Sequence, residues 1–138
     1  MRIGRARAAH LRAGRRGEAL AVRLLEADGC AILTRNFRVK AGELDIVARD
    51  GATLLFVEVK TLRREGFYRP ADNLSPRQRA RNFRAARWYW RMIGSPRMRC
   101  RFDLVEVVLS RWGARSIRRI RDYLPPLDNG GDRFDGVF

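Results

Sequence analysis

No part of this chain limits its fold as strongly as the stretch from Gly42 to Thr61. Two runs rich in β-branched and apolar residues, Gly42–Ala48 and Thr53–Thr61, flank the dipeptide Asp50-Gly51. An Asp-Gly step between two such runs is typical of a two-residue hairpin turn. We therefore expect two adjacent antiparallel strands with Asp50 and Gly51 at the centre of the turn.

This turn sets which residues face one another across the hairpin. With Asp-Gly at its centre, Glu43 lies opposite Glu58. Side chains on a strand alternate between its two faces, so four charged residues project from one face of the sheet: Glu43, Asp45, Glu58 and Lys60. The opposite face is apolar and consists of Leu44, Ile46, Leu55, Val57 and Val59.

Three carboxylates at one end of a sheet repel one another, at roughly 3 kcal/mol per pair for a separation of ~5 Å and an effective dielectric constant near 20. A divalent ion with oxygen ligands, Mg²⁺ or Mn²⁺, bound by Asp45 and Glu58 would offset this repulsion. Such an ion would polarise a scissile phosphate, and Lys60 would position the attacking water or stabilise the charge of the pentacovalent phosphate. The hairpin by itself equally fits an exposed strand end with ordinary ion pairs, each worth about 0–1 kcal/mol.

The remaining patterns predict a single α/β domain. Apolar residues recur at helical spacing from about Arg15 to Asp28, and Ser75-Pro76-Arg77-Gln78 has the form of a capping box that starts a helix ending near Ile93. Further strand patterns occupy Ala31–Val39, Phe102–Leu109 and, more weakly, Ala114–Arg121. The order helix, three strands, helix, one or two strands predicts a mixed sheet of four to five strands flanked by helices.

The two ends of the chain differ in composition from its centre. Residues 1–14 contain basic residues without an acidic one, and we expect them to form a basic flexible arm. A Pro-Pro step at 125–126 opens a Gly- and Asp-rich tail, which we expect to be disordered over 125–138. The folded domain then comprises residues 15–124.

The formal net charge of the 138-residue chain is +15, from 30 basic and 15 acidic residues. This imbalance indicates a polyanionic partner, and nucleic acid is the first candidate because arginines release counterions from phosphates. An anionic membrane surface or an RNA-rich assembly would satisfy the charge equally well. The chain has no run of 18 apolar residues and no secretory signal pattern, so we expect a cytoplasmic protein without membrane contact.

The predicted second helix has a basic and an apolar side. At about 100° per residue, one arc of the helix collects five arginines: Arg77, Arg81, Arg84, Arg87 and Arg91. We expect this arc to contact phosphates of a nucleic acid. Trp88 falls in the same arc, where it could stack on an unpaired base or pack against another loop or a second subunit.

The hairpin also resembles a known family signature. The run Gly42-Glu43-Leu44-Asp45-Ile46-Val47-Ala48-Arg49-Asp50-Gly51, followed by Leu55-Phe56-Val57-Glu58-Val59-Lys60-Thr61, is similar to that of the small bacterial YraN-like family. That family resembles a branch of the PD-(D/E)xK, or restriction-endonuclease-like, superfamily, which includes archaeal Holliday junction resolvases. The resemblance extends from about Gly17 to Leu109 and implies a restriction-endonuclease-like fold.

The resemblance implies a role for individual residues. Asp45 matches the motif aspartate and Glu58-Val59-Lys60 the E-x-K tripeptide, with the carbonyl of Val59 as a further metal ligand. Glu18 matches a glutamate that the superfamily often adds from its first helix, although a partner for the helix dipole is an alternative. Gln78 matches a glutamine that follows E-x-K in some members, but we favour the capping-box role. Glu43 is a further auxiliary residue.

The sequence thus favours a Mg²⁺- or Mn²⁺-dependent endonuclease that hydrolyses phosphodiester bonds in structured or single-stranded nucleic acid, with DNA expected rather than RNA. Asp45, Glu58 and Lys60 are its expected catalytic residues. One alternative is a non-catalytic nucleic-acid-binding protein that retains the nuclease fold. A weaker one is a scaffold in a repair or RNA-processing complex. A homodimer would suit the cutting of two strands.

Overall fold

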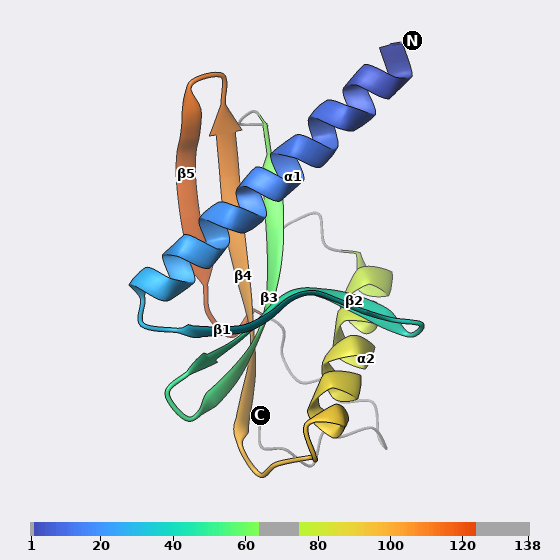
Figure 1. Cartoon of the computed structure of the whole chain (residues 1–138), viewed down its shortest axis with the longest axis vertical. Coiled ribbons are helices and arrows are strands. Elements are labelled where there is room, and N and C mark those ends of the chain that lie inside the picture. Colours follow the sequence, from blue (N-terminus) through green and yellow to red (C-terminus); the bar gives the residue numbers. More distant parts are fainter. Residues whose placement is uncertain (1, 64–74, 124–138) are drawn as a thin grey trace.

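The computed structural model describes residues 2–63 and 75–123, which form a five-stranded sheet with one helix packed on each face (Figure 1). The elements are, in chain order, α1 (Arg2–Ala27), β1 (Ala31–Val39), β2 (Gly42–Asp50), β3 (Thr53–Leu62), α2 (Pro76–Met92), β4 (Arg99–Ser110) and β5 (Gly113–Ile120). This arrangement confirms the predicted α/β class and the mixed, helix-flanked sheet, and it is consistent with a restriction-endonuclease-like fold.

The strands lie in the sheet in their chain order, β1-β2-β3-β4-β5. All neighbouring pairs are antiparallel except β3 and β4, which run parallel. Antiparallel neighbours need only a short turn, whereas a parallel pair requires a crossover. Helix α2 belongs to that crossover, and it covers one face of the sheet.

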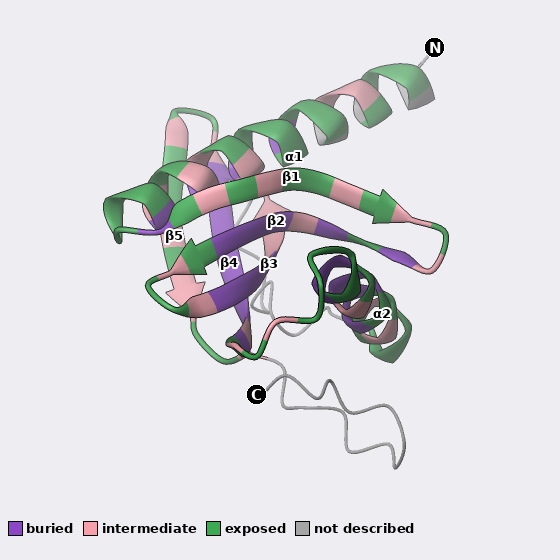
Figure 2. Cartoon of the chain, turned by 60° about the horizontal axis from the view of Figure 1, so that its bottom comes forward, coloured by how far each residue is buried: buried purple, intermediate pink, exposed green. Residues whose placement is uncertain are grey.

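Two hydrophobic clusters fill the space between the sheet and its helices. On the α2 side, Phe83, Tyr89 and Trp90 pack against Val47, Phe56 and Phe102. On the α1 side, Ala21 and Leu25 pack against Ile46, Val57 and Val105. Figure 2 shows the buried residues concentrated on the central strands, while β1 at the edge alternates between exposed and partly buried positions.

Leu44 is on the other side of the sheet from where strict alternation puts it. We expected it beside Ile46 and Val57, but it belongs to the cluster under α2. Since Ile46 stays in the α1 cluster, the alternation of β2 breaks between these two residues. The break falls at Asp45, whose side chain accepts a hydrogen bond from the backbone of β3.

Helix α1 is longer than predicted. It begins at Arg2 instead of near Arg15, so residues 2–14, which we expected to form a flexible arm, continue the helix. Arg and Ala have high helix propensity, and this local preference persists where the amphipathic pattern is absent. Figure 1 shows this part of α1 extending away from the sheet. The expected disordered tail, 125–138, lies outside the described residues.

The β2–β3 turn differs from the prediction. Asp50 pairs with Thr53, so the central residues of the turn are Gly51 and Ala52 instead of Asp50 and Gly51. Gly51 has φ +58°, a conformation that suits glycine and that a type II′ turn requires at this position. The predicted pairing of Glu43 with Glu58 is therefore wrong, and the true register brings Asp45 beside Glu58 instead.

An ion-pair cluster around Asp103, here called the Asp103 cluster, ties β4 to β5 and to the end of α1. The Asp103 side chain is fully buried. Arg101 donates two hydrogen bonds to it, at 2.8 and 3.0 Å, and Arg119 donates two more, at 3.0 and 2.9 Å. Arg119 also bonds Asp28 at 2.8 Å. No local pattern indicates this cluster, because its members are up to 91 positions apart.

Candidate active site

Asp45 lies where β2 and β3 separate. Their pairing runs from the turn to Ile46 and Val57 and ends there. One residue further, Asp45 Oδ2 accepts a hydrogen bond of 2.8 Å from the main-chain N–H of Val59. The Asp45 side-chain oxygen thus accepts a β3 N–H in the way that a main-chain carbonyl of β2 would in a continued strand pairing. The four charged residues of the hairpin consequently do not share one face as predicted, because this carboxylate turns towards the neighbouring backbone.

Glu58 is the centre of a hydrogen-bonded group between β3 and α2. Its Oε1 accepts a bond of 2.7 Å from the side-chain amide of Gln78, and its Oε2 accepts one of 3.1 Å from Asn82. Lys60 Nζ lies 3.9 Å from Glu58 Oε1 and donates to Gln78 Oε1 at 3.1 Å. Both glutamate oxygens are therefore held in place by α2.

The start of α2 explains how the two amides reach Glu58. Ser75 caps the helix by accepting the main-chain N–H of Gln78 at 3.1 Å, and Pro76 occupies the first helical position. The Gln78 side chain, which we assigned to the capping box, instead bridges Glu58 and Lys60. The capping role assigned to the Gln78 side chain is therefore wrong. The side chain lies at the site, as the family resemblance implies.

Asn82 is a site residue that the sequence patterns did not single out. It follows Gln78 by four positions, and residues at this spacing lie on the same side of a helix. It is 2% exposed, on a helix whose other buried residues are apolar or aromatic. The sequence did contain a signal for Asn82. It is a polar residue on the sheet-facing side of the predicted helix, one turn after Gln78.

Glu18 reaches the site from the α1 side of the sheet. A Cβ atom at Gly17 would collide with the side chain of Thr61, so glycine lets α1 lie directly against β3 at this point. Glu18 Oε1 is buried and has no hydrogen-bond partner among the described residues. Because α1 begins at Arg2, Glu18 is far from its first turn, and the helix-dipole alternative is wrong.

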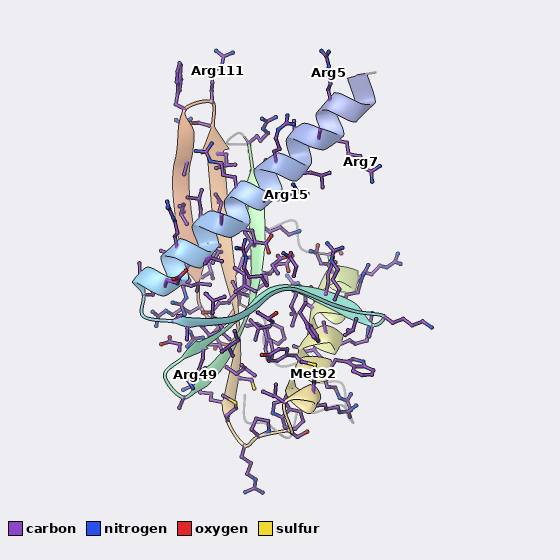
Figure 3. The ribbon with its side chains drawn as sticks, in the orientation of Figure 1. Arg5, Arg7, Arg15, Arg49, Met92 and Arg111 are labelled. Carbon is purple, nitrogen blue, oxygen red and sulfur yellow. The ribbon has the colours of Figure 1, made fainter. Side chains whose placement is uncertain are left out.

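A cleft of about 790 Å³ connects Glu18 with the hairpin residues. It is bounded by α1, β1, β2 and the end of β3, and Figure 3 shows Arg15 on the part of α1 that passes over β3. We call it the first cleft. Its lining includes three predicted site residues besides Glu18, and three arginines: Asp45, Val59, Lys60, Arg15, Arg38 and Arg63. Acidic groups and arginines thus share one cavity.

The acids at the site have raised pKa values. Burial, followed by the charge of Asp45, raises the pKa of Glu58 to about 9, although Lys60 opposes the shift. Burial also raises the pKa of Asp45, although the hydrogen bond from the Val59 N–H opposes this shift. Burial likewise raises the pKa of Glu18, and the charge of Asp45 adds to the effect. Asp45 and Glu58 are close enough for each carboxyl group to shift the pKa of the other. The pair therefore retains a proton at neutral pH unless a cation replaces it.

The oxygen donors suit a hard divalent ion. Within residues 2–63 and 75–123, no three His, Cys, Asp or Glu side chains are grouped closely enough to hold a metal by themselves. Mg²⁺, however, is commonly bound through one or two carboxylates, with waters and substrate phosphates completing its shell. Asp45 and Glu58 supply two carboxylates, and Glu18 lines the same cleft as Asp45. The residues present therefore fit Mg²⁺ or Mn²⁺.

Glu43 stays at the edge of this group. Its side chain is 50% exposed and lies 3.7 Å from Arg38, its partner across β1 and β2. Its charge raises the pKa of Asp45, after burial and the local hydrogen bonds. Glu43 is thus near the site without belonging to the hydrogen-bonded group around Glu58.

The arginines predicted for nucleic-acid contact lie on α2. Four of them are exposed and Arg87 is half-buried. A Cβ atom at Gly42 would collide with the main chain of Arg81, so this glycine lets α2 lie against the β1–β2 turn, where Arg84 bonds the carbonyl of Ala41 at 3.1 Å. Trp88 is 57% exposed. Most of the arc is therefore exposed to solvent, and its contact with nucleic acid stays a prediction.

Comparison with known proteins places the chain in a family. A family model described as "Uncharacterised protein family UPF0102" matches residues 17–107. The chain belongs to the UPF0102 family. This is the YraN-like family that the hairpin signature resembles, and the part matched by the UPF0102 model includes Glu18, the whole hairpin, Gln78 and Asn82.

Individual UPF0102 proteins are similar over most of their length. The UPF0102 protein of Streptomyces griseus is 49% identical over 102 residues, which are 73% of this chain and 86% of the relative. That of Chlorobaculum parvum is 41% identical over 105 residues, covering 76% and 81%. In the described part of this UPF0102 chain, no helix has the length and apolar character needed to cross a membrane.

Proposed function

We propose that this UPF0102 protein is a Mg²⁺- or Mn²⁺-dependent endonuclease that hydrolyses phosphodiester bonds in structured or single-stranded DNA. The observation that carries the proposal is the Asp45–Glu58 carboxylate pair with Lys60 beside it. Asp45 and Lys60 line a cleft that also contains Glu18 and three arginines. Clustered acids repel a polyanion and have no use in a surface that only binds nucleic acid. A divalent ion held by these carboxylates would make them a centre for phosphoryl chemistry.

Asp45 and Glu58 would hold the ion, with Glu18 and the carbonyl of Val59 as further oxygen donors. When bound, the ion would polarise the scissile phosphate and lower the pKa of a coordinated water. Gln78 and Asn82 orient the Glu58 carboxylate through both of its oxygens, as residues behind a metal ligand commonly do.

Lys60 supplies a fixed positive charge beside the carboxylates. Its ammonium is held by Gln78 at 3.1 Å and by Glu58 at 3.9 Å, and the side chain is 26% exposed. The charge therefore lies at the cleft wall, where it can stabilise the extra negative charge of the phosphate in the transition state. The arginines of the first cleft, Arg15, Arg38 and Arg63, would bind the phosphates on either side of the scissile bond.

The net charge of +15 and the exposed arginines of α2 support nucleic acid as the partner. Neither feature resembles a base-reading motif, so recognition would depend on backbone and shape.

A second candidate function is nucleic-acid binding without catalysis. The observation in its favour is that described protein groups already donate to both oxygens of Glu58 and accept a hydrogen bond from the ammonium of Lys60. If no divalent ion displaces these contacts, the group is a structural link between β3 and α2, and only the arginines act.

Cleavage assays separate the two candidates. The protein is incubated with flap, junction and single-stranded DNA and with RNA, with Mg²⁺, with Mn²⁺ or with EDTA. We expect metal-dependent cleavage of at least one DNA substrate. Asp45→Asn, which keeps an acceptor for the Val59 N–H, and Lys60→Ala should each slow it by roughly 10²-fold or more, because several kcal/mol of transition-state stabilisation are lost.

Glu26→Gln is the matched control, since it removes one exposed carboxylate from the end of α1. It should cleave like the wild type. Equal cleavage by Asp45→Asn and the wild type would refute the site. Binding of every substrate without cleavage of any would favour the second candidate.

A further inference from the structure

A second cleft lies next to the first, on the β4 side of α1. Its volume is about 570 Å³. Whereas residues of β1 and β2 border the first cleft, the second is bordered by the end of β4 and the turn that follows it. Ala13 and Arg63 line both clefts, so the two are neighbours. None of the residues on the β4 side has a role in the proposed chemistry.

The second cleft is strongly basic. Four of its lining residues are arginines and none is acidic among those described: Arg12, Ala13, Arg16, Arg63, Leu109, Ser110 and Arg111. Arg16 reaches across it, because its Nη2 lies 3.4 Å from where a Cβ atom on Gly113 would be. The guanidinium of α1 therefore lies against the β4–β5 turn. Figure 3 shows Arg111 at the same end of the molecule as Arg5 and Arg7.

The β4–β5 turn presents an exposed tryptophan beside this cleft. Trp112 is 89% exposed and is one of two residues between the paired Ser110 and Gly113. The Ser110 hydroxyl donates to the carbonyl of Gly113 at 3.1 Å and accepts the N–H of Trp112 at 3.2 Å. The turn is thus braced on both sides, and the indole is held in solvent on a defined backbone.

We propose that the second cleft binds the backbone of an unpaired nucleic-acid strand leaving the first cleft, and that Trp112 stacks on one of its bases. The inference rests on the proposed function, because it assigns this strand to the same substrate. Arginines without acidic neighbours favour phosphates. An exposed aromatic ring gains from a base whose face is free, and the bases inside a duplex have none. Arg63, common to both clefts, would contact the strand where it passes between them.

Binding measurements test this without requiring cleavage. A labelled blunt duplex is compared by fluorescence anisotropy, in EDTA, with the same duplex carrying a single-stranded extension of about ten nucleotides. The extension should tighten binding by the wild type. Trp112→Ala should weaken binding of the extended duplex about tenfold, the effect of losing one stacked base, and leave the blunt duplex unchanged.

Charge reversals test the arginines. Arg16→Glu and Arg111→Glu should weaken binding of the extended duplex selectively. Each should also lower the slope of log affinity against log salt by about 0.7 for every phosphate that the variant no longer neutralises. Arg49→Glu is the matched control: it is exposed on β2 and lies at the opposite end of the molecule from Arg111 (Figure 3). It should not distinguish the two duplexes.

The inference is overturned if the extension adds no affinity, or if Trp112→Ala and Arg16→Glu weaken both duplexes equally. It is also overturned if Trp112→Ala changes the sedimentation of the free protein, which would make the turn a contact between two copies, or if it abolishes binding to vesicles of anionic phospholipid. Selective binding of the extended duplex by a protein that cleaves nothing would support the second cleft and refute the nuclease. Cleavage by the wild type, together with unchanged binding by the variants, would support the nuclease and refute the second cleft.

Discussion

Two buried groups of carboxylates in this protein, around Asp103 and around Glu58, differ in the partners that surround them. Asp103 is held by two arginines and by the main-chain N–H of Asp122. Burial alone would raise its pKa, but these hydrogen bonds outweigh burial and hold the pKa below its usual value. Glu58 is held by two neutral amides beside a second carboxylate and one lysine, and burial raises its pKa to about 9.

The comparison separates a structural ion-pair cluster from a candidate site. In the Asp103 cluster the positive charge needed by the buried acid is supplied by the chain itself. Around Glu58 that charge is insufficient, because Asp45 and Glu58 compete for Lys60. A group of buried acids that lacks cations is an arrangement that costs stability, and such arrangements are common where a ligand supplies the missing charge.

The largest expected effect is at the Asp103 cluster. Asp103→Asn should lower the free energy of unfolding by about 3–5 kcal/mol, because it leaves buried guanidinium charge without its main partner. Since the folded-state pKa of Asp103 is lowered, its contribution is present above the unfolded pKa and is lost as pH falls through the folded value. The deficit of the variant, measured by denaturant titration, should therefore be full at pH 7 and shrink in acid.

Asp122→Asn is the control for this experiment, since the Asp122 side chain is exposed while its main chain keeps the bond to Asp103. It should change stability by less than about 0.5 kcal/mol. If the Asp103→Asn protein is as stable as the wild type, the Asp103 cluster does not stabilise the fold and its contrast with the Glu58 group fails.

Glu58→Gln should change the free energy of unfolding in the opposite direction from Asp103→Asn. The folded-state pKa of Glu58 is raised, so its contribution is complete below its ordinary value of 4.5 and is lost as pH rises towards about 9. In EDTA, the variant should gain stability over the wild type by roughly 1–3 kcal/mol between pH 5 and pH 8. Thermal melts across this range measure the difference, with Glu26→Gln as the control.

The same variant should lose the DNA cleavage that we propose for the wild type with Mg²⁺. Gained stability with lost activity is the signature of a site whose charges serve a ligand. If Glu58→Gln is destabilised at every pH, the carboxylate is needed for folding. The group around Glu58 is then structural, like the Asp103 cluster.

A smaller effect is expected at Asn82. Asn82→Ala leaves one oxygen of Glu58 without its donor, which should cost about 1–2 kcal/mol of stability. If Glu58 binds a metal, cleavage should also fall by roughly 10–100-fold, the usual cost of losing a residue that orients a ligand. Met92→Ala, at an exposed position near the end of α2, is the control. Unchanged cleavage with reduced stability would make Asn82 a packing residue only.

The smallest effect is expected at Glu43. Its pair with Arg38 is solvent-exposed on both sides, and such pairs contribute about 0–1 kcal/mol. Glu43→Gln should therefore leave the free energy of unfolding within about 0.5 kcal/mol of the wild type and cleavage within a small factor. If cleavage falls as far as in Asp45→Asn, Glu43 belongs to the site after all.

Much of the fold was predictable because periodicity is local. The order of elements, the hairpin and the start of α2 follow from spacings within short segments, and Ser75 caps its helix as expected. The start of α1 was missed because residues 2–14 have helix propensity without an amphipathic pattern. The hairpin register was missed because two turns of equal length, Asp50-Gly51 and Gly51-Ala52, are compatible with the same alternation.

The sequence alone determined that Asp45, Glu58 and Lys60 meet near the hairpin, because they occur on two adjacent strands joined by a short turn. Only the tertiary structure decided how they meet. It made Asp45, not Glu43, the neighbour of Glu58, placed the predicted Glu18 in the same cleft as Asp45, added Asn82, and opened a second basic cleft at the β4–β5 turn. These features depend on where α1 crosses β3 and where two strands separate, and contacts between distant segments, not local spacing, set both.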